Sequence, residues 1–472
     1  MAEATLARQL GSFAVATRED GAPPTVRSSV QLRILDILGI ATAATEIDTS
    51  ISVLEMVRRM GGAAESSTIG SPGRVPAAWA AFTNGVLAHS LDFDDTHLPS
   101  VLHPSASVVP AGLAIADSES ASGAATIDAI AAGIETTVRI GMAGYDANAR
   151  NSIYFEHGQH ATSICGTIGS AVTAALLFGL DVSGVVDAIG IAASMASGVI
   201  EGNRTGGTVK RMHCGWAAHS GVVAADLARS GMTGPPTVLE GRFGLFEAFL
   251  HGQFDGSAVT DRLGSHWETP GVFFKPYPAN HFTHTAADAV MQLRDSGLQP
   301  EEVDRITVGV ATPTVRTIGE PIEAKRRPAT GYQAQFSGPY VVAAALLGGG
   351  GLGLALDDFA DDLVDDPRRL DLMDRVEIRA DPRCDAIYPS QFPAIVEVVT
   401  KAGTRLSASV LTNRGGPDRP MSSEEIALKF RTNAGRRIPS QTADCVTELC
   451  EDLAVSDRAG ILIDTLNEGF AQ

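Results

Sequence analysis

Positive charge is scarce in this sequence. It contains 36 Lys and Arg residues against 55 Asp and Glu residues, which gives a formal net charge of −19. Proteins that bind nucleic acid present a basic face, so this balance argues against a nucleic-acid partner. A small anionic substrate is still compatible with the charge, because a local basic pocket can oppose the field of the whole chain.

Cysteine is also scarce. The five cysteines are odd in number and include no CxxC pair, which argues against a disulfide framework. We therefore expect reduced thiols in a cytoplasmic protein. The first residues read Met-Ala-Glu-Ala-Thr and lack the basic and apolar regions of a secretory signal, so we expect no signal peptide.

Several catalytic signatures are missing. The chain has no GxSxG nucleophile elbow. Its two HxxH spacings, 157/160 and 281/284, lack the Glu that follows the first His in zinc hydrolases. Residues 348–353 fit GxGxxG, but they follow a helical pattern rather than a strand, so we interpret them as a helix exit. We expect no metal and no cofactor, because a catalytic zinc needs three convergent protein ligands.

One uncharged run, residues 161–180, is long enough to span a bilayer. Gly, Ser, Thr and Ala fill more than half of it, and basic and aromatic anchors are missing at its ends. We therefore expect a buried helix of a large helical domain, and no membrane partner.

Apolar periodicity and capping residues predict helices through the first half of the chain, with small residues that allow close helix packing. Near residue 270 the pattern changes to short runs rich in Val, Ile and Thr, which are typical of strands. The predicted fold is mainly α: a large discontinuous all-helical domain, 1–270 plus 417–472, with a smaller inserted α+β lid domain, 271–416. The predicted helices are 27–45, 51–60, 76–91, 104–116, 127–142, 161–178, 182–200, 217–230, 284–296, 338–347, 426–432, 442–455 and 457–466, and the predicted strands are 303–311, 374–380, 394–400 and 404–410.

The densest group of ionisable residues lies within residues 91–107. Three carboxylates, a hydroxyl and two imidazoles fall within a dozen residues of otherwise apolar chain: Asp92, Asp94, Asp95, Thr96, His97 and His103. Burying so many ionisable groups is costly unless they pair or bind a ligand. Asp94 and Asp95 could instead be caps of the following helix, which is what Asp near a helix start usually is.

Three further polar segments stand in apolar surroundings: 157–160, 210–219 and 275–284. Together with the acidic cluster they supply imidazoles, lysines and a threonine without a metal or cofactor motif. Such a set can bind carboxylates and transfer a proton at the neighbouring carbon. Removing a proton next to a carboxylate requires preorganised cations and hydrogen-bond donors to stabilise the developing charge.

The sequence resembles the MmgE/PrpD family over nearly the whole chain, and three stretches carry the resemblance. They are the run from Asp92 to Ser105, the turn 202–207 with Lys210 and the segment 215–221, and the segment 231–241. The resemblance implies a large helical domain with a smaller lid, a homodimer, and work without a metal. Family members include 2-methylcitrate dehydratase, cis-aconitate decarboxylase and iminodisuccinate epimerase.

The resemblance also implies site residues. The expected catalytic residues are His103, His160, Asp92, Thr96 and Tyr340, and the expected substrate-binding residues are Lys210, Lys275, His281 and Arg211. We expect closure of the lid to bring Lys275 and Tyr340 to His103 and Lys210, which excludes water. The expected activity is a cofactor-independent lyase acting on a small di- or tricarboxylate, with dehydration of a hydroxy polycarboxylate favoured. The alternatives are decarboxylation of a cis-aconitate-like substrate, epimerisation of an iminodisuccinate-like one, and a metabolite-binding protein without turnover.

Overall fold

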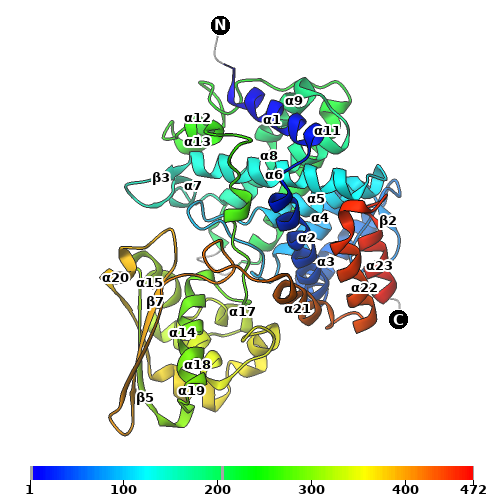
Figure 1. Ribbon diagram of the computed structural model, residues 1–472. Helices are drawn as coiled ribbons and strands as arrows, with labels where there is room; N and C mark the ends of the chain where they lie inside the picture. Colours follow the sequence, from blue (N-terminus) through cyan, green and yellow to red (C-terminus); the bar gives the residue numbers. More distant parts are fainter. Residues whose placement is uncertain (1–3, 203–206, 471–472) are drawn as a thin grey trace. The chain divides into compact units, whose positions relative to one another are not determined.

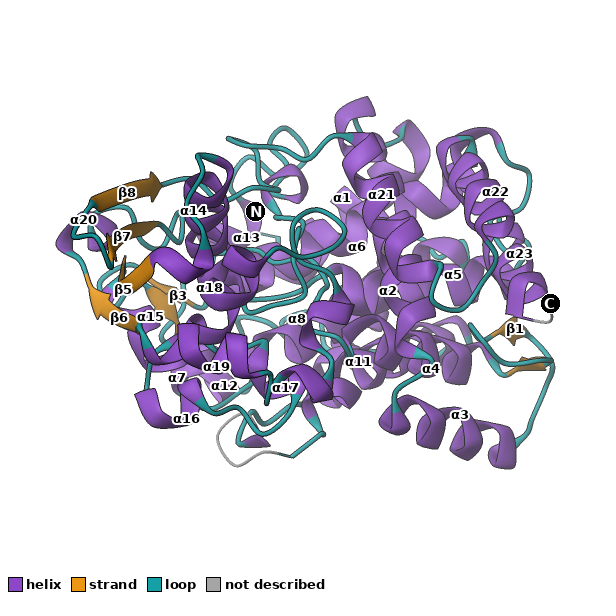
Figure 2. Ribbon diagram, turned by 90° about the horizontal axis from the view of Figure 1, so that it is seen from below, coloured by secondary structure: helices purple, strands orange, loops and turns teal. Residues whose placement is uncertain are grey.

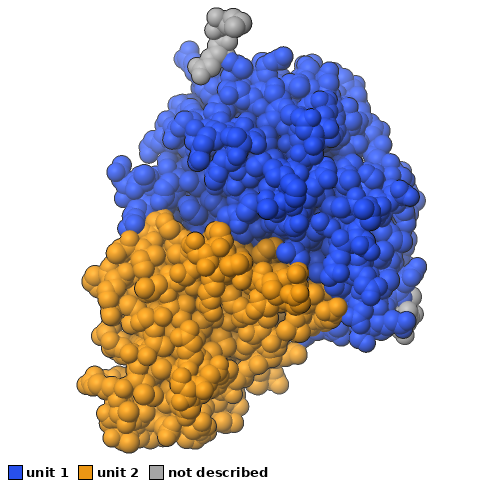
Figure 3. Space-filling view, viewed as in Figure 1, with its two compact units in different colours: residues 1–90, 94–272, 433–472 blue, residues 91–93, 273–432 orange. Residues whose placement is uncertain are grey.

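The computed structural model describes residues 4–202 and 207–470. The chain forms two compact units, coloured separately in Figure 3. Unit 1 comprises 1–90, 94–272 and 433–472, and unit 2 comprises 91–93 and 273–432. Part of the glycine-rich turn used for the family resemblance, residues 203–206, lies outside the described residues.

Unit 1 is built from helices, with two short two-stranded hairpins at its edges (Figure 1). Its longer helices are α1 (Leu6–Asp20), α2 (Pro24–Ala44), α3 (Asp48–Met60), α4 (Ala77–His89), α5 (Ser105–Ser118), α6 (Gly123–Ala143), α8 (Ala161–Leu177), α9 (Val182–Met195), α11 (Lys210–Arg229), α22 (Ser440–Glu451) and α23 (Ile461–Phe470). Its shorter elements are α7 (Ile153–Glu156), α12 (Leu245–Leu250), α13 (Ser257–Thr260), and the hairpins β1–β2 (Ser66–Ser67, Arg74–Val75) and β3–β4 (Tyr145–Asp146, Asn151–Ser152).

Small residues bring the central helices of unit 1 close together, as the sequence predicted. A Cβ added at Gly85 of α4 would lie only 2.8 Å from the Cα of Gly215 of α11. A Cβ added at Gly133 of α6 would lie 2.7 Å from the carbonyl oxygen of Gly169 of α8. Both additions are sterically forbidden, so these helix crossings require glycine. The first crossing places the end of α4, with His89, beside the first turns of α11.

The uncharged run 161–180 forms α8, which is buried along almost its whole length in unit 1. This confirms the prediction of a buried helix. Within the described ranges, no single helix is both long and apolar enough to cross a bilayer. Helices α2 and α3 reach the required length and composition only as a pair, across a bend of 94°.

Unit 2 contains a four-stranded sheet in the order β6–β5–β7–β8 (Figure 2). Its strands are β5 (Val303–Val310), β6 (Val376–Ala380), β7 (Ala394–Thr400) and β8 (Arg405–Val410). Strand β5 pairs parallel with β6, with Ile306 opposite Val376, and antiparallel with β7, with Val308 opposite Val396. Its helices are α14 (His284–Asp295), α15 (Thr312–Ile318), α16 (Ile322–Arg326), α17 (Gly331–Ala334), α18 (Gly338–Leu347), α19 (Pro367–Asp374), α20 (Pro382–Asp385) and α21 (Ser423–Ala434).

One face of this sheet carries the core of unit 2. Helix α14 packs against β7 and β8, and α18 packs against α14 and β6. Their Ala, Val and Leu residues form one buried cluster with the inward side chains of the strands. After α18 the glycine-rich segment leaves the helix through Gly348 and Gly351, both with positive φ. This confirms the helix exit predicted for 348–353.

The mainly helical fold with a smaller α+β region is confirmed, and the differences are local. The helix predicted over 182–200 ends at Met195, because Ala196 turns to an extended conformation and Gly198 has φ +144°. The helix predicted from 217 begins at Lys210 instead, because close packing against α4 overrides the low helix propensity of Gly215. Unit 2 ends at residue 432, so it includes 417–432, a segment predicted to be in the helical domain.

Candidate active site

Four helix ends meet in the interior of unit 1. Helix α4 ends at His89, and α5, α8 and α11 begin at Ser105, Ala161 and Lys210. These helices pack on one another. The positive ends of three helix dipoles therefore point toward one region, which favours negatively charged groups there.

His103, predicted to be the main acid/base residue, lies just before α5 and is 11% exposed. Its Nδ1 is 2.6 Å from the carbonyl oxygen of Asp95 and 3.3 Å from Thr96 Oγ1. A carbonyl oxygen only accepts, so Nδ1 carries the proton and donates it. The backbone N–H of His103 also donates to Thr162 Oγ1 at 3.2 Å. The ring is thus held in one orientation, and its Nε2 is the atom that can exchange a proton with a substrate.

Asp95 has a structural position. Its carboxylate pairs with Arg33 at 2.7 Å, and both side chains are almost completely buried. It also accepts hydrogen bonds from the backbone N–H and the hydroxyl of Ser105, the first residue of α5. Arg33 donates in turn to the carbonyl oxygens of Thr269 and Val272. The capping interpretation therefore holds for Asp95.

Asp94 has a different partner. Its Oδ2 lies 2.7 Å from Nδ1 of His89, and neither side chain is exposed. The same oxygen lies 4.0 Å from Nδ1 of His103. The ring of His89 is centred 5.3 Å from that of His103 and 5.6 Å from that of His160. One buried carboxylate is thus hydrogen-bonded to His89 and also lies near His103.

His160, also predicted to be catalytic, precedes the first residue of α8. Its Nδ1 faces Nδ1 of His213 at 2.9 Å, so one ring donates and the other accepts. The carbonyl oxygen of His213 accepts from Ser163 Oγ at 3.1 Å. Burial, followed by the charges of His89 and Lys210, lowers the pKa of His213 to about 4 and that of His160 well below its ordinary value. Both rings are therefore neutral at pH 7.

Lys210 and Arg211, predicted to bind substrate, lie in the first turn of α11. Lys210 acts electrostatically on three neighbours, since its charge contributes to the pKa shifts of His160, His213 and Cys214. Arg211 donates from Nη1 to Thr49 Oγ1 at 2.9 Å. Lys210 is therefore placed with the imidazoles, whereas Arg211 contacts the start of α3.

Unit 2 holds the other predicted residues. Lys275 donates from Nζ to the carbonyl oxygen of Asp92 at 2.7 Å and to its Oδ2 at 3.2 Å, and both residues are buried. Asp92 adopts φ +52°, a left-handed conformation that is rare for a residue other than glycine. A second buried lysine, Lys429, donates to the carbonyl oxygen of Phe93 at 3.0 Å. Two ammonium groups thus hold the segment 91–93 in unit 2.

His281 and Tyr340 are also buried in unit 2. The ring of His281 packs against that of His284, with centroids 4.6 Å apart. His284 Nε2 donates to the carbonyl oxygen of Ala279, and burial lowers its pKa to about 3. Tyr340 is buried in the α18 core, and its hydroxyl donates to the carbonyl oxygen of Asp358 at 2.8 Å. The catalytic role expected for Tyr340 and the substrate contact expected for His281 stay predictions.

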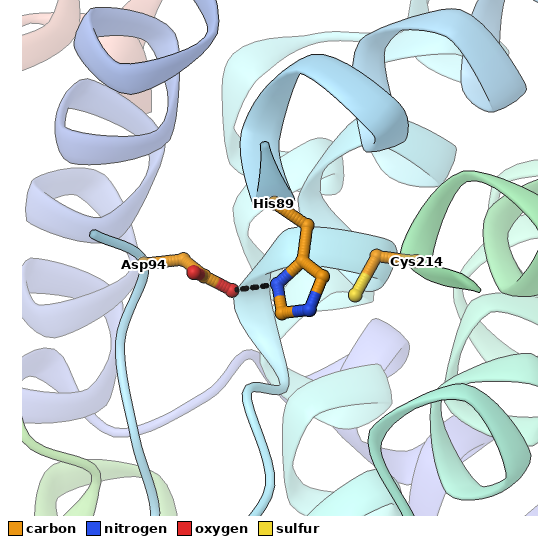
Figure 4. Close-up of side chains that lie close together, drawn as sticks. All are labelled: His89, Asp94 and Cys214. Carbon is orange, nitrogen blue, oxygen red and sulfur yellow. Dashed lines mark hydrogen bonds and ion pairs between the residues drawn. The ribbon is translucent and has the colours of Figure 1, made fainter. Parts of the chain in front are cut away.

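One group of possible metal ligands occurs in the described part of the chain: His89, Asp94 and Cys214, whose donor atoms lie within 4.8 Å of one another. In Figure 4 the imidazole stands between the carboxylate and the thiol, and its Nδ1 already bonds Asp94. Burial raises the pKa of Cys214 well above its ordinary value, which favours the thiol over the metal-binding thiolate. An ion bound by all three residues would have to replace the Asp94–His89 hydrogen bond, so the arrangement fits a hydrogen-bonded network better than a metal site.

Two family models account for most of the chain. The model of the MmgE/PrpD N-terminal domain matches residues 8–256, and that of the C-terminal domain matches residues 277–454. The chain belongs to the MmgE/PrpD family. This confirms the resemblance stated from the sequence. The boundary between the two matches falls close to the predicted start of the α+β domain.

Among the relatives of this MmgE/PrpD protein is cis-aconitate decarboxylase of Homo sapiens, 29% identical over 449 residues, which are 92% of this chain and 88% of the relative. The decarboxylase of Aspergillus terreus is 27% identical over 455 residues, 92% of this chain and 90% of the relative. These carboxy-lyases and the family match make the protein an enzyme of the lyase or isomerase kind.

Sequence reasoning did not assign site roles to His89, Asp94 and His213. His89 ends an apolar helix, and a lone His there indicates a buried core residue as readily as a site. His213 was missed because the helix was started at Ala217. A helix from Lys210 places Lys210, His213 and Cys214 on one face, three and four residues apart. This spacing was the signal that could have identified them.

Proposed function

We propose that the protein is a carboxy-lyase that removes one carboxylate from a small unsaturated tricarboxylate, with cis-aconitate as the first candidate. Relatives named cis-aconitate decarboxylase align over nine-tenths of the chain. The observation that carries the proposal is the single tautomer of His103, whose Nδ1–H is bound by the carbonyl oxygen of Asp95. This ring can deliver a proton through one defined atom, in a region that favours anions.

The reaction needs such a proton. In cis-aconitate the bond between the CH2 carbon and its carboxylate breaks, and CO2 leaves. The electron pair of that bond forms a new double bond from the CH2 carbon to the central carbon. The electron pair of the old double bond moves to its CH carbon and binds one proton there. One trianion and one proton thus give one dianion and CO2. Protonated His103 donates this proton from Nε2. Its Nδ1 keeps its own proton, which stays hydrogen-bonded to the carbonyl oxygen of Asp95.

Substrate binding and charge stabilisation come from the positively charged groups. Lys210 and the starts of α5, α8 and α11 bind the carboxylates that remain, and stabilise the negative charge that develops as the bond breaks. Neutral His160, held by His213, offers a hydrogen bond without adding charge. Thr96, which lies 3.3 Å from Nδ1 of His103, belongs to the same proposed site in unit 1. The roles expected for Asp92, Lys275 and Tyr340 of unit 2 stay predictions.

Decarboxylation was an alternative in the sequence analysis, which favoured dehydration. The named relatives favour the alternative. Dehydration and epimerisation use a proton transfer at the same kind of carbon, so the experiment must separate them by product.

The purified enzyme is incubated in D2O with cis-aconitate, citrate, methylcitrate or iminodisuccinate, and the products are followed by NMR together with released CO2. We expect CO2 from cis-aconitate and an unsaturated dicarboxylate with one carbon-bound deuterium. A hydroxy acid formed without CO2 would replace the proposal with a dehydratase, and stereochemical exchange of iminodisuccinate with an epimerase. Binding of these acids without turnover or deuterium uptake would indicate a metabolite binder.

A further inference from the structure

His89 lies at the centre of the imidazole group of unit 1, although it was not among the predicted site residues. Its ring neighbours those of both His103 and His160, at 5.3 and 5.6 Å. It ends α4, and the glycine crossing of Gly85 with Gly215 holds that end against α11. Its Nδ1 bonds Asp94, and its buried Nε2 has no hydrogen-bond partner.

Asp94 lies beside two imidazoles. An ionised carboxylate only accepts, so His89 donates its Nδ1–H to Asp94 Oδ2. The same oxygen is 4.0 Å from the protonated Nδ1 of His103. A positive charge on either ring is stabilised by this single carboxylate, and two positive charges at this ring separation repel each other. Protonation of one imidazole therefore opposes protonation of the other.

We propose that His89 is a positioning residue that competes with His103 for Asp94 and thereby sets the pH range in which His103 transfers its proton. The inference rests on the proposed function for the role of His103, and extends it to a residue that does not touch the reacting atoms.

Other charged or titratable groups lie around these rings and are unchanged in the variants that are compared. They come from α2, from the turn before α5, from the start of α8 and from α11: Arg33 with Asp95, His160, Lys210, His213 and Cys214. The effect of His89 also reaches the other pair, since its charge is the largest contribution after burial to the lowered pKa values of His160 and His213.

Two conservative variants should shift the pKa of His103 in opposite directions. In His89→Asn the amide keeps an N–H toward Asp94 but cannot become charged, so the full charge of Asp94 acts on His103, whose pKa rises. In Asp94→Asn the carboxylate is lost and the pKa of His103 falls. We expect shifts of about one pH unit each. They are measured by NMR titration of histidine-labelled protein, with the His103 signal identified by its loss in His103→Asn, and by the matching limb of the pH–rate profile.

The control is His97→Asn. His97 is buried in the same turn, but its Nδ1 bonds the neutral hydroxyl of Ser100 at 2.6 Å, so this variant should leave the His103 titration in place. Opposite shifts of the His103 pKa in the two test variants support the inference, because a general loss of structure would not raise this pKa in one variant and lower it in the other. Shifts of the same sign, or none in folded protein, overturn it. The titration needs no substrate, so a failure to release CO2 from cis-aconitate affects only the proposed function.

Discussion

His160 and His213 face each other through their Nδ1 atoms at 2.9 Å, in the interior of a helical unit. Only one of the two rings can donate in this bond, so the pair carries one shared proton between two nitrogens. The pair connects the start of α8 to the first turn of α11, and it is kept neutral by burial and by the positive charges beside it.

This pair makes the stability of the enzyme depend on pH. Burial lowers the pKa of His213 from 6.5 to about 4. Between these values the unfolded chain binds a proton that the folded chain does not, so the stabilisation present above pH 6.5 is lost as the pH falls. Each such histidine contributes a slope of roughly 1.4 kcal/mol per pH unit. The unfolding free energy should therefore fall less steeply between pH 6.5 and 4 in His213→Asn than in the parent protein. The difference in slope should correspond to about one proton fewer taken up on unfolding, measured by thermal unfolding at a series of pH values. An unchanged slope would contradict the assignment.

His103→Asn tests proton transfer. Asn keeps an N–H for the Asp95 carbonyl but has no ionisable nitrogen. We expect substrate binding to persist and kcat to fall by about a hundredfold or more, the usual scale of general acid/base catalysis. Binding is measured by calorimetry and turnover by CO2 release. His266, whose side chain is 43% exposed and lies 3.3 Å from Glu268, is the control, and His266→Asn should retain kcat. A normal kcat in His103→Asn would remove His103 from the reaction.

Lys210→Ala tests the anion-binding role. Loss of the ammonium group should lower kcat/KM by roughly a hundredfold or more, because a charge-assisted contact to a carboxylate is lost. The same change should raise the pKa of His213, since the charge of Lys210 lowers it. Arg229→Ala, at the opposite end of α11, is the control on the same helix. Near-normal kinetics in folded Lys210→Ala would place this lysine outside the site.

Asp95→Ala tests the structural role of the second carboxylate. The change breaks the buried ion pair of Asp95 with Arg33, which should cost about 3 to 5 kcal/mol of stability. The exposed pair Arg262–Asp261, at 3.4 Å, provides the comparison. Asp261→Ala should cost less than about 1 kcal/mol, because exposed pairs contribute little. Thermal unfolding midpoints measure both effects, and equal midpoints in the two variants would contradict the assignment.

Chelation tests the metal-free expectation. We expect full activity after exhaustive treatment with EDTA, because Nδ1 of His89 already bonds Asp94 (Figure 4) and burial favours the thiol of Cys214 over the metal-binding thiolate. Activity that is lost with EDTA and restored by zinc or magnesium would make these three residues a metal site.

Local pattern was sufficient for most of the fold. Strand β7 and helix α18 begin and end at the predicted residues, because alternation and capping are properties of a few neighbouring residues. Residue spacing within short motifs also indicated the family, which the family models confirm. The site roles of His103 and Lys210 stay predictions. Homodimer assembly and a cytoplasmic location were further expectations and stay predictions.

The partners of the site residues were decided by tertiary structure. Asp94 and Asp95 are neighbours with the same chemistry, yet one bonds His89 and the other pairs with Arg33. That difference depends on how α2 and α4 pack, and a sequence pattern does not contain it. The start of α11 at Lys210 likewise depends on the contact of Gly215 with α4, where packing outweighs the helix propensity of single residues. The sequence thus determined which chemical groups are present, and only the packing of distant helices determined which of them share a proton.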